Sequence, residues 1–194
     1  MAVVKSLCVY CGASDLVDPE YRQAALELGT RLAEAGIELV YGGGRIGLMG
    51  RLADAARQGG GRVTGIIPAH LHDREIGHHG ISELIVVGSM HERKQLMFER
   101  ADAFAVLPGG LGTIEEAFEI ITWKQLRLHD KPIVLVSVAG YWQRFGSLVD
   151  HVIDSGFASR QVGSLFQVVD TVDALMAALV AAREPVLEPE AKLI

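Results

Sequence analysis

The sequence predicts a single α/β domain built on a parallel sheet of about seven strands, with helices on both faces. Short apolar segments alternate with longer segments of helical periodicity along nearly the whole chain, as expected when parallel strands are joined by crossover helices. The segment Ala103–Leu107 is apolar throughout, which is typical of a strand buried on both faces of such a sheet. We therefore expect one doubly wound, Rossmann-like domain over residues 1–183. The proline- and acid-rich segment 184–194 is expected to form a loosely held tail.

The strands are marked by short apolar runs with turn residues at their ends. Pro68 stops the third run and Pro132 introduces the sixth, because proline cannot donate a hydrogen bond within a sheet. The expected strands are Ser6–Cys11, Glu38–Tyr41, Arg62–Ile67, Glu83–Val87, Ala103–Leu107, Ile133–Val136 and Leu165–Val169.

The helices are marked by apolar residues at helical spacing. In Pro19–Ala35 they form one stripe, and Gly36 is placed to end this helix. A second helix is expected after the glycine-rich turn at residues 42–47, ending near Gln58, and a third begins at Met90. Further helices are expected over Ala117–Leu128, Tyr141–Ser155 and Val172–Arg183. The residues from His70 to His79 are predicted to form a long loop, and long loops in compact α/β domains are often functional.

Composition limits the classes of partner. The 194 residues carry a formal net charge of -6, which argues against a nucleic-acid-binding or anionic-membrane-binding surface. The segment Met1–Ser6 lacks the long apolar region of a signal peptide, and no apolar run approaches the length of a membrane span. We therefore expect a cytoplasmic protein.

The only two cysteines, Cys8 and Cys11, form a C-x-x-C pattern that could indicate a redox or metal site. Both lie in the first expected strand, where an odd separation points two side chains to opposite faces. Buried, reduced thiols are the expected state. The histidines of the long loop, His70, His72, His78 and His79, match no strong zinc pattern, so no metal site is predicted.

The turn after the second strand contains Gly42-x-Gly44-x-x-Gly47, which matches the dinucleotide-binding pattern weakly. It follows the second strand rather than the first, and the third strand ends at Pro68 with no acidic residue to bind a ribose hydroxyl. No G-x-x-x-x-G-K-[S/T] sequence occurs either, so P-loop nucleotide hydrolysis is not expected. Two glycine-rich turns at one edge of the sheet remain, and they would suit a mononucleotide.

The second of these turns is the segment Pro108–Glu116, with the sequence P-G-G-L-G-T-I-E-E, between a strand and a helix. Its glycines let backbone N–H groups converge on a ligand, and the helix start adds its positive end, so an anion cradle is predicted. Glu115 and Glu116 then suggest that a cation or a proton is handled there. Thr113-x-x-Glu116 also fits a capping box, which would give Glu116 a purely structural role. The local pattern favours neither role of Glu116 over the other.

Taken together, these motifs resemble the LOG family, the cytokinin riboside 5'-monophosphate phosphoribohydrolases. The resemblance extends over nearly the whole chain and rests most on P-G-G-x-G-T-x-x-E at residues 108–116 together with Met90-His91-Glu92-Arg93-Lys94 upstream. It also includes the Tyr41–Gly50 segment, Arg74-Glu75-Ile76, Ile121-Thr122-Trp123 and His129-Asp130-Lys131-Pro132.

The resemblance implies hydrolysis of the N-glycosidic bond of AMP or N6-prenylated AMP, without a cofactor and in a homodimer. It makes Arg93 and Glu116 the catalytic pair. The residues it implies in substrate binding are Glu75, Lys94, Gly109, Gly110, Leu111, Gly112, Thr113, Ile114, Glu115 and Thr122, with Ser14, Gly43, Gly44 and Met49 as further candidates. Family members have also been labelled lysine decarboxylases, but no pyridoxal-phosphate site pattern is apparent.

The chemistry fits these residue types. Breaking the bond between C1' and the base builds positive charge on the ribose. An ionised Glu116 would either stabilise this charge or orient the attacking water. Arg93 could hold the base, the phosphate or Glu116, because guanidinium is a good fork and a poor proton donor. The imidazole-rich loop Gly77–Ser82 departs from the commoner family form, so the choice between AMP and N6-modified AMP is left open. A non-catalytic nucleotide carrier, or another phosphosugar or nucleotide enzyme, would be the alternative function.

The helix Ala117–Leu128 carries apolar residues around much of its circumference, more than one core-facing stripe requires. A second subunit is therefore expected to cover part of it, in a homodimer.

Overall fold

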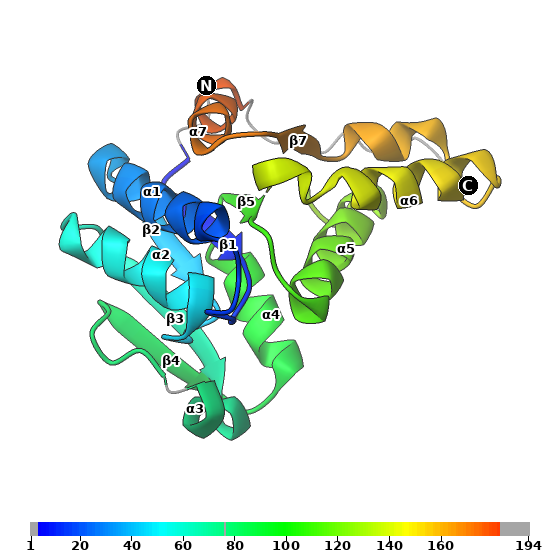
Figure 1. Cartoon of the computed structure of the whole chain (residues 1–194). Helices are drawn as coiled ribbons and strands as arrows, with labels where there is room; N and C mark the ends of the chain where they lie inside the picture. Colours follow the sequence, from blue (N-terminus) through cyan, green and yellow to red (C-terminus); the bar gives the residue numbers. More distant parts are fainter. Residues whose placement is uncertain (1–3, 76, 183–194) are drawn as a thin grey trace.

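Seven parallel strands form one sheet in the order β4-β3-β2-β1-β5-β6-β7 (Figure 1). The computed structural model describes residues 4–75 and 77–182, and the side chains of 73–75 are outside that description. The predicted parallel α/β sheet is confirmed. The strands are β1 (Ser6–Tyr10), β2 (Glu38–Tyr41), β3 (Val63–Pro68), β4 (Glu83–Val87), β5 (Ala103–Val106), β6 (Ile133–Val136) and β7 (Gln167–Val169).

The strand order reverses beside β1. From β1 the chain steps outward through β2 and β3 to β4, and it then returns to place β5 on the other side of β1. β1 and β5 pair in parallel, with Val9 opposite Ala105 and Tyr10 opposite Val106. Connections leave these two strands in opposite directions, so a crevice opens beyond their carboxyl ends, where doubly wound proteins bind ligands.

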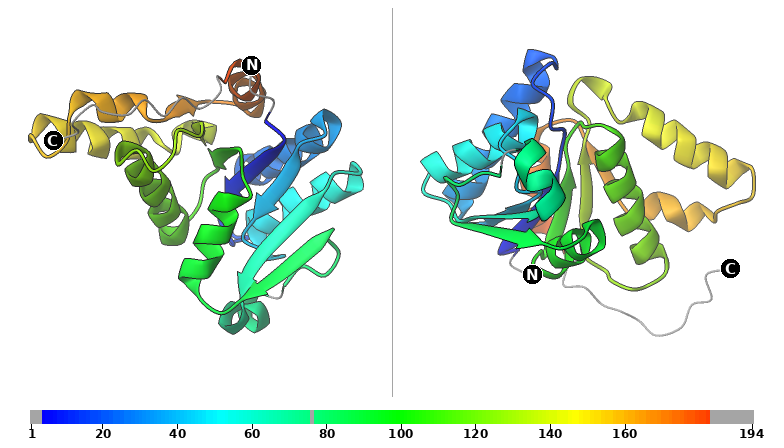
Figure 2. Two further views of the ribbon diagram at one scale, coloured as in Figure 1. Left: turned by 180° about the vertical axis from the view of Figure 1, so that it is seen from behind. Right: turned by 90° about the horizontal axis from the view of Figure 1, so that it is seen from below.

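Helices cover both faces of the sheet (Figures 1 and 2). α1, α2 and α7 pack on one face, while α4, α5 and α6 pack on the other. The bounds are α1 (Pro19–Ala35), α2 (Gly47–Gln58), α3 (Ala69–Glu75), α4 (Met90–Glu99), α5 (Leu111–Gln125), α6 (Gln143–Asp154) and α7 (Val172–Ala181), with short 3-10 turns η1 (Val138–Gly140) and η2 (Arg160–Ser164).

Alternate residues of β1 enter different cores. Leu7 and Val9 pack with α1 and α2, whereas Cys8 packs with Phe104 and α5 on the opposite face. Cys11, just past the strand, belongs to the first core, so the prediction that the two cysteines face opposite ways is confirmed. Both thiols are free and buried, and burial raises the pKa of each well above its usual range.

Several predicted elements differ in extent from the structure. β3 includes Pro68, which was expected to end it, and β7 begins at Gln167 rather than at Leu165. The expected loop after β3 contains helix α3, which begins directly after Pro68 and extends to Glu75. The helix expected over Ala117–Leu128 begins six residues earlier, at Leu111, because Gly110 provides its extended N-cap, and it ends at Gln125. The segment 184–194, predicted to be a loosely held tail, lies outside the described residues.

Within residues 4–75 and 77–182, no helix is both long and apolar enough to cross a membrane.

Candidate active site

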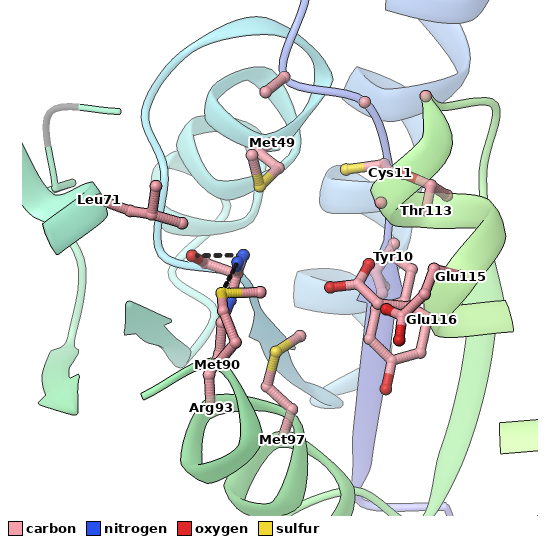
Figure 3. Close-up of a pocket in the computed structure, with 16 residues that line it drawn as sticks. Tyr10, Cys11, Met49, Leu71, Met90, Arg93, Met97, Thr113, Glu115 and Glu116 are labelled. Carbon is pink, nitrogen blue, oxygen red and sulfur yellow. Dashed lines mark hydrogen bonds between the residues drawn. The ribbon is translucent and has the colours of Figure 1, made fainter. Parts of the chain in front are cut away.

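A cavity of about 320 Å³ lies at the point where the strand order reverses (Figure 3). It is bounded by the segments that follow β1, β2 and β5 and by α4 and α5. Its lining consists of Val9, Tyr10, Cys11, Gly12, Ala13, Gly42, Met49, Leu71, Met90, Arg93, Met97, Gly110, Gly112, Thr113, Glu115 and Glu116. Seven of the predicted site residues therefore lie in one cavity: Met49, Arg93, Gly110, Gly112, Thr113, Glu115 and Glu116.

The turns after β1 and β5 are held together by backbone contact. The N–H of Gly12 donates a hydrogen bond to the carbonyl of Pro108 at 3.1 Å. Gly109 must be glycine, because a methyl group there would lie 2.2 Å from Oγ1 of Thr113 and 2.8 Å from the Gly12 nitrogen. The hydroxyl of Tyr141 also donates to the Gly109 carbonyl. The contact between these two turns fixes where α5 begins.

The start of α5 is open toward the cavity. Among the described residues, the N–H groups of Leu111, Gly112 and Thr113 have no hydrogen-bond partner. A methyl group at Gly110 or Gly112 would meet no atom within 4 Å. Free N–H groups at a helix start, beside open space and the positive end of the helix dipole, form an anion-binding site.

Thr113 and Glu116 do not form the capping box that their spacing would allow. Gly110 is the N-cap of α5, and no side chain accepts a hydrogen bond at the cap. Thr113 is thus the third helical residue, and Glu116 lies in the second turn rather than the first. Glu116 is buried, with 9% of its surface exposed, and it lines the cavity. Its position leaves it no capping role.

The first glycine-rich turn is occupied by the protein's own oxygen atoms. At the start of α2, the N–H of Gly47 donates to Oδ2 of Asp15 at 3.3 Å, and the N–H of Leu48 donates to the Gly12 carbonyl at 3.0 Å. Hydrogen bonds from Arg51 and from the Gly47 N–H lower the pKa of Asp15, which keeps its carboxylate charged. At the start of α2 the N–H groups therefore bond within the protein, whereas the described N–H groups at the start of α5 remain open to a ligand.

Arg93 lies on the wall opposite Glu116 (Figure 3). Ser89 caps α4, and Arg93 follows in the first turn with 6% of its surface exposed. Its Nη2 donates to the Gly42 carbonyl at 3.1 Å, and its Nη1 lies 3.8 Å from Sδ of Met90. Among the described residues, its Nε has no partner and no carboxylate forms an ion pair with it. A buried guanidinium with spare donors favours an electron-rich ligand.

Lys94 faces away from the cavity. Its Nζ lies 2.6 Å from Oε1 of Glu115 and 2.8 Å from Oε1 of Glu119, and it is not part of the lining. Burial lowers the pKa of Lys94, but the hydrogen bonds and charges of the two carboxylates outweigh burial and raise it overall. Lys94 thus joins α4 to α5, and Glu115 reaches both this ion pair and the cavity rim.

The other predicted site residues lie at or beyond the edge of the cavity. Leu111 is 85% exposed, Thr122 is exposed on α5, Ile114 is half-buried, and none of the three is in the lining. Glu75 ends α3, and its side chain lies outside the described part of the chain. Ser14, Gly43 and Gly44 belong to the segments around the first turn: the Ser14 hydroxyl accepts from Leu16 N, the Gly43 carbonyl accepts from His78 N, and Gly44 pairs with Gly77.

Sequence reasoning missed part of the lining. Met90 and Met97 share one face of α4 with Arg93, at spacings of three and four residues, and this periodicity was available in the sequence. Gly12 and Gly42 directly follow β1 and β2, so their place at the carboxyl edge was also available. Leu71 could not have been found, because its helix was not predicted.

Comparison with known proteins agrees with the motifs. A family model described as "Possible lysine decarboxylase" matches residues 49–179. The chain is 48% identical over 155 residues to cytokinin riboside 5'-monophosphate phosphoribohydrolase LOG7 of Arabidopsis thaliana, covering 80% of this chain and 71% of that protein. It is 48% identical over 162 residues to the probable enzyme LOGL9 of Oryza sativa subsp. japonica, covering 84% and 71%.

Among solved structures, the fold is similar to the molybdenum cofactor binding protein of Rippkaea orientalis, with a TM-score of 0.69, 19% identity, and coverage of 91% of this chain and 95% of that one. At this identity, the likeness concerns the fold alone. The match to the family model and the identity to the plant proteins are far more specific. The chain belongs to the family that the model describes as possible lysine decarboxylases and that includes the cytokinin riboside 5'-monophosphate phosphoribohydrolases.

Proposed function

We propose that this protein hydrolyses the N-glycosidic bond of adenosine 5'-monophosphates, N6-modified ones included, to free base and ribose 5-phosphate. The observation that carries the proposal is one cavity with an open helix start, a buried carboxylate on one wall and a buried guanidinium on the other. The identity to plant phosphoribohydrolases over most of the chain supports the same reaction.

The 5'-phosphate binds at the start of α5 in this proposal. The N–H groups of Leu111, Gly112 and Thr113 are available to its oxygens, and the missing side chains at Gly110 and Gly112 leave it room. The α2 start cannot serve, because Asp15 already occupies it with negative charge. A phosphate held at α5 directs the ribose between the walls that carry Glu116 and Arg93.

Glu116 and Arg93 then act on the two sides of the bond that breaks. As the bond lengthens, positive charge develops at the ribose, and the buried Glu116 carboxylate stabilises it. Electron density moves to the base, and Arg93 donates hydrogen bonds to it, since its Nε has no hydrogen-bond partner among the described residues. Water adds its hydroxyl to C1', and its proton ends on the released base. No further reactant is needed.

The name attached to the family model does not fit the cavity. Decarboxylation of lysine by pyridoxal phosphate needs a lysine that forms a Schiff base with the cofactor. The described cavity lining contains no lysine, and the nearby Lys94 is held by Glu115 and Glu119. The residues of the described cavity therefore do not favour decarboxylation by pyridoxal phosphate.

We also propose that the protein is a cytoplasmic homodimer that binds neither nucleic acid nor membrane. Leu126 and Leu128, directly after α5, are 61% and 63% exposed, and Leu111 at the start of α5 is 85% exposed. Leucines this exposed at and just beyond the ends of one helix favour coverage by a second copy of the chain. Sedimentation at micromolar concentration should then show a species of twice 20.9 kDa. A species of single mass alone would contradict the dimer.

One assay tests the reaction. The purified protein is incubated with AMP and, separately, with N6-isopentenyl-AMP, in the presence of a chelator, and free base and ribose 5-phosphate are measured by chromatography. Equal amounts of both products should appear. A non-catalytic carrier would bind the nucleotide in calorimetry and release neither product, and that result would contradict the proposal.

A further inference from the structure

Gly42, the first glycine of the G-x-G-x-x-G pattern, lies at the end of β2 and lines the cavity. Gly43 and Gly47 of the same turn have positive φ angles, of 77° and 68°, which favour glycine for conformational reasons. Gly42 does not have a positive φ angle. Its backbone would accept another residue, so the reason for glycine must be sought in the surrounding space.

That space is occupied by Arg93. A methyl group at Gly42 would lie 2.0 Å from Nη2 of Arg93, 3.2 Å from its Cζ and 3.2 Å from Sδ of Met49. The carbonyl of Gly42 is at the same time the only oxygen that accepts a hydrogen bond from this guanidinium among the described residues, at 3.1 Å. Nη2 of the guanidinium therefore lies against the backbone of residue 42, in the place where a side chain would begin.

We propose that Gly42 is a positioning residue that sets the guanidinium of Arg93 in the wall of the cavity. The inference rests on the proposed function, in which that guanidinium faces the departing base. The pattern that resembles a dinucleotide-binding turn thus serves an arginine rather than a pyrophosphate. The α2 start that would hold a pyrophosphate is instead filled by Asp15 and by the Gly12 carbonyl.

The nearest atoms show which part of the molecule would move if residue 42 carried a side chain. The atom that collides is the far end of a long, flexible side chain, while no backbone atom lies within 4 Å among the three nearest contacts. Gly42→Ala should therefore leave the sheet and α4 in place and push the guanidinium out of its position. Misplacement of a catalytic group by about 1 Å can cost a hundredfold in rate.

A double-mutant cycle tests this with four proteins: wild type, Gly42→Ala, Arg93→Ala and the double variant. For each protein, kcat/KM for base release from AMP, AMP affinity by calorimetry and the thermal unfolding midpoint are measured. We expect Gly42→Ala to lose at least a hundredfold in kcat/KM, mainly in kcat, and the double variant to lose no more than Arg93→Ala alone. Gly146→Ala, in α6 with open space around it, is the control for a glycine change that meets nothing.

The outcomes separate this inference from the proposed function. Near wild-type kcat/KM in Gly42→Ala, or losses that multiply in the double variant, would overturn the positioning role while the reaction itself stands. If wild type releases no base, the proposed function fails, and the AMP affinities of the four proteins then test the positioning role by themselves. Non-additive losses of affinity support the placement of Arg93 by Gly42, and additive losses overturn it. If Gly42→Ala does not fold, a double variant as stable as Arg93→Ala supports the inference, and a double variant that also fails to fold overturns it.

Discussion

The ammonium of Lys94 lies 2.8 Å from a carboxylate oxygen of Glu119, and so ties α4 to α5 behind the cavity. Arg93 precedes Lys94 on α4, and Glu116 lies one turn before Glu119 on α5. The two helices carry the two opposed side chains of the candidate site, and this ion pair sets their separation. The Arg93-Lys94 pair therefore divides its work: one side chain faces the cavity and the other holds the walls together.

Replacing Lys94 should thus affect stability and activity together. Lys94→Met leaves Glu115 and Glu119 without their shared partner, and we expect a loss of about 1–3 kcal/mol in the free energy of unfolding, measured with urea. kcat/KM should fall as well, because the walls separate. The double variant Lys94→Met/Glu119→Gln should recover part of the stability, since one unpaired charge is removed. Lys5→Met, a change at an exposed lysine, is the control. A Lys94→Met protein as stable as that control would contradict the role.

Adding a methyl group at Gly112 should separate stability from substrate binding. Gly112 lies in the first turn of α5 with nothing within 4 Å of its missing side chain, and alanine is favoured over glycine in helices by up to about 1 kcal/mol. Gly112→Ala should therefore unfold no earlier than wild type, but it should raise KM for AMP at least tenfold, because the methyl group takes space next to the phosphate. Gly146→Ala, equally open but in α6, should leave KM unchanged. Equal KM values in all three proteins would place the phosphate elsewhere.

Stability should decrease on acidification through His129. Burial lowers the pKa of this histidine below 6.5, and the charges of Lys124 and Lys131 lower it further. Its Nε2 bonds the Ile120 carbonyl at 2.8 Å, and its Nδ1 accepts from the Lys131 N–H at 3.1 Å, so a proton on Nδ1 would break the second bond. A group whose folded pKa is depressed binds its proton first in the unfolded state. The contribution is therefore present above about pH 6.5 and is lost as the pH falls toward the folded value.

Urea unfolding between pH 7.5 and 5 measures this effect. His129→Gln should be less stable at neutral pH and should show a shallower loss of stability below pH 6.5 than wild type. His91→Gln, at an exposed histidine on α4, is the control and should follow the wild-type curve. Parallel curves for wild type and His129→Gln would mean that another group titrates.

Much of the fold could be predicted because parallel strands buried on both faces leave a continuous apolar signal. Ala103–Val106 and Ile133–Val136 are such runs, and both are fully buried. α3 was missed because seven residues with two histidines carry too little periodicity to distinguish a short helix from a loop. α3 begins directly after Pro68, and the end of β3 at this residue depends on its pairing with β4, which the sequence alone does not show.

Site residues that directly follow a strand could be predicted. The sequence could not show which of several neighbouring residues caps a helix or faces the cavity. The glycines of residues 109–112 indicated an open helix start, but which residue caps it depends on the contact between Gly109 and Gly12. The same contact moves Glu116 from a capping position into the second turn. Arg93 and Lys94 are adjacent cations in the sequence, and only the packing of α4 shows that one faces the cavity and the other faces Glu119.

The most direct test of the account is the rate of base release by Glu116→Gln. Glutamine keeps the shape of the side chain and does not disturb a cap, because Gly110 caps α5 without Glu116. The thermal unfolding midpoint should stay close to that of wild type. Glutamine carries no charge to stabilise the ribosyl cation, so kcat for base release from AMP should fall on the order of a hundred- to a thousandfold. Glu34→Gln, the same chemical change at an exposed position in α1, should keep the wild-type rate. A folded Glu116→Gln protein that releases base as fast as Glu34→Gln would contradict the account.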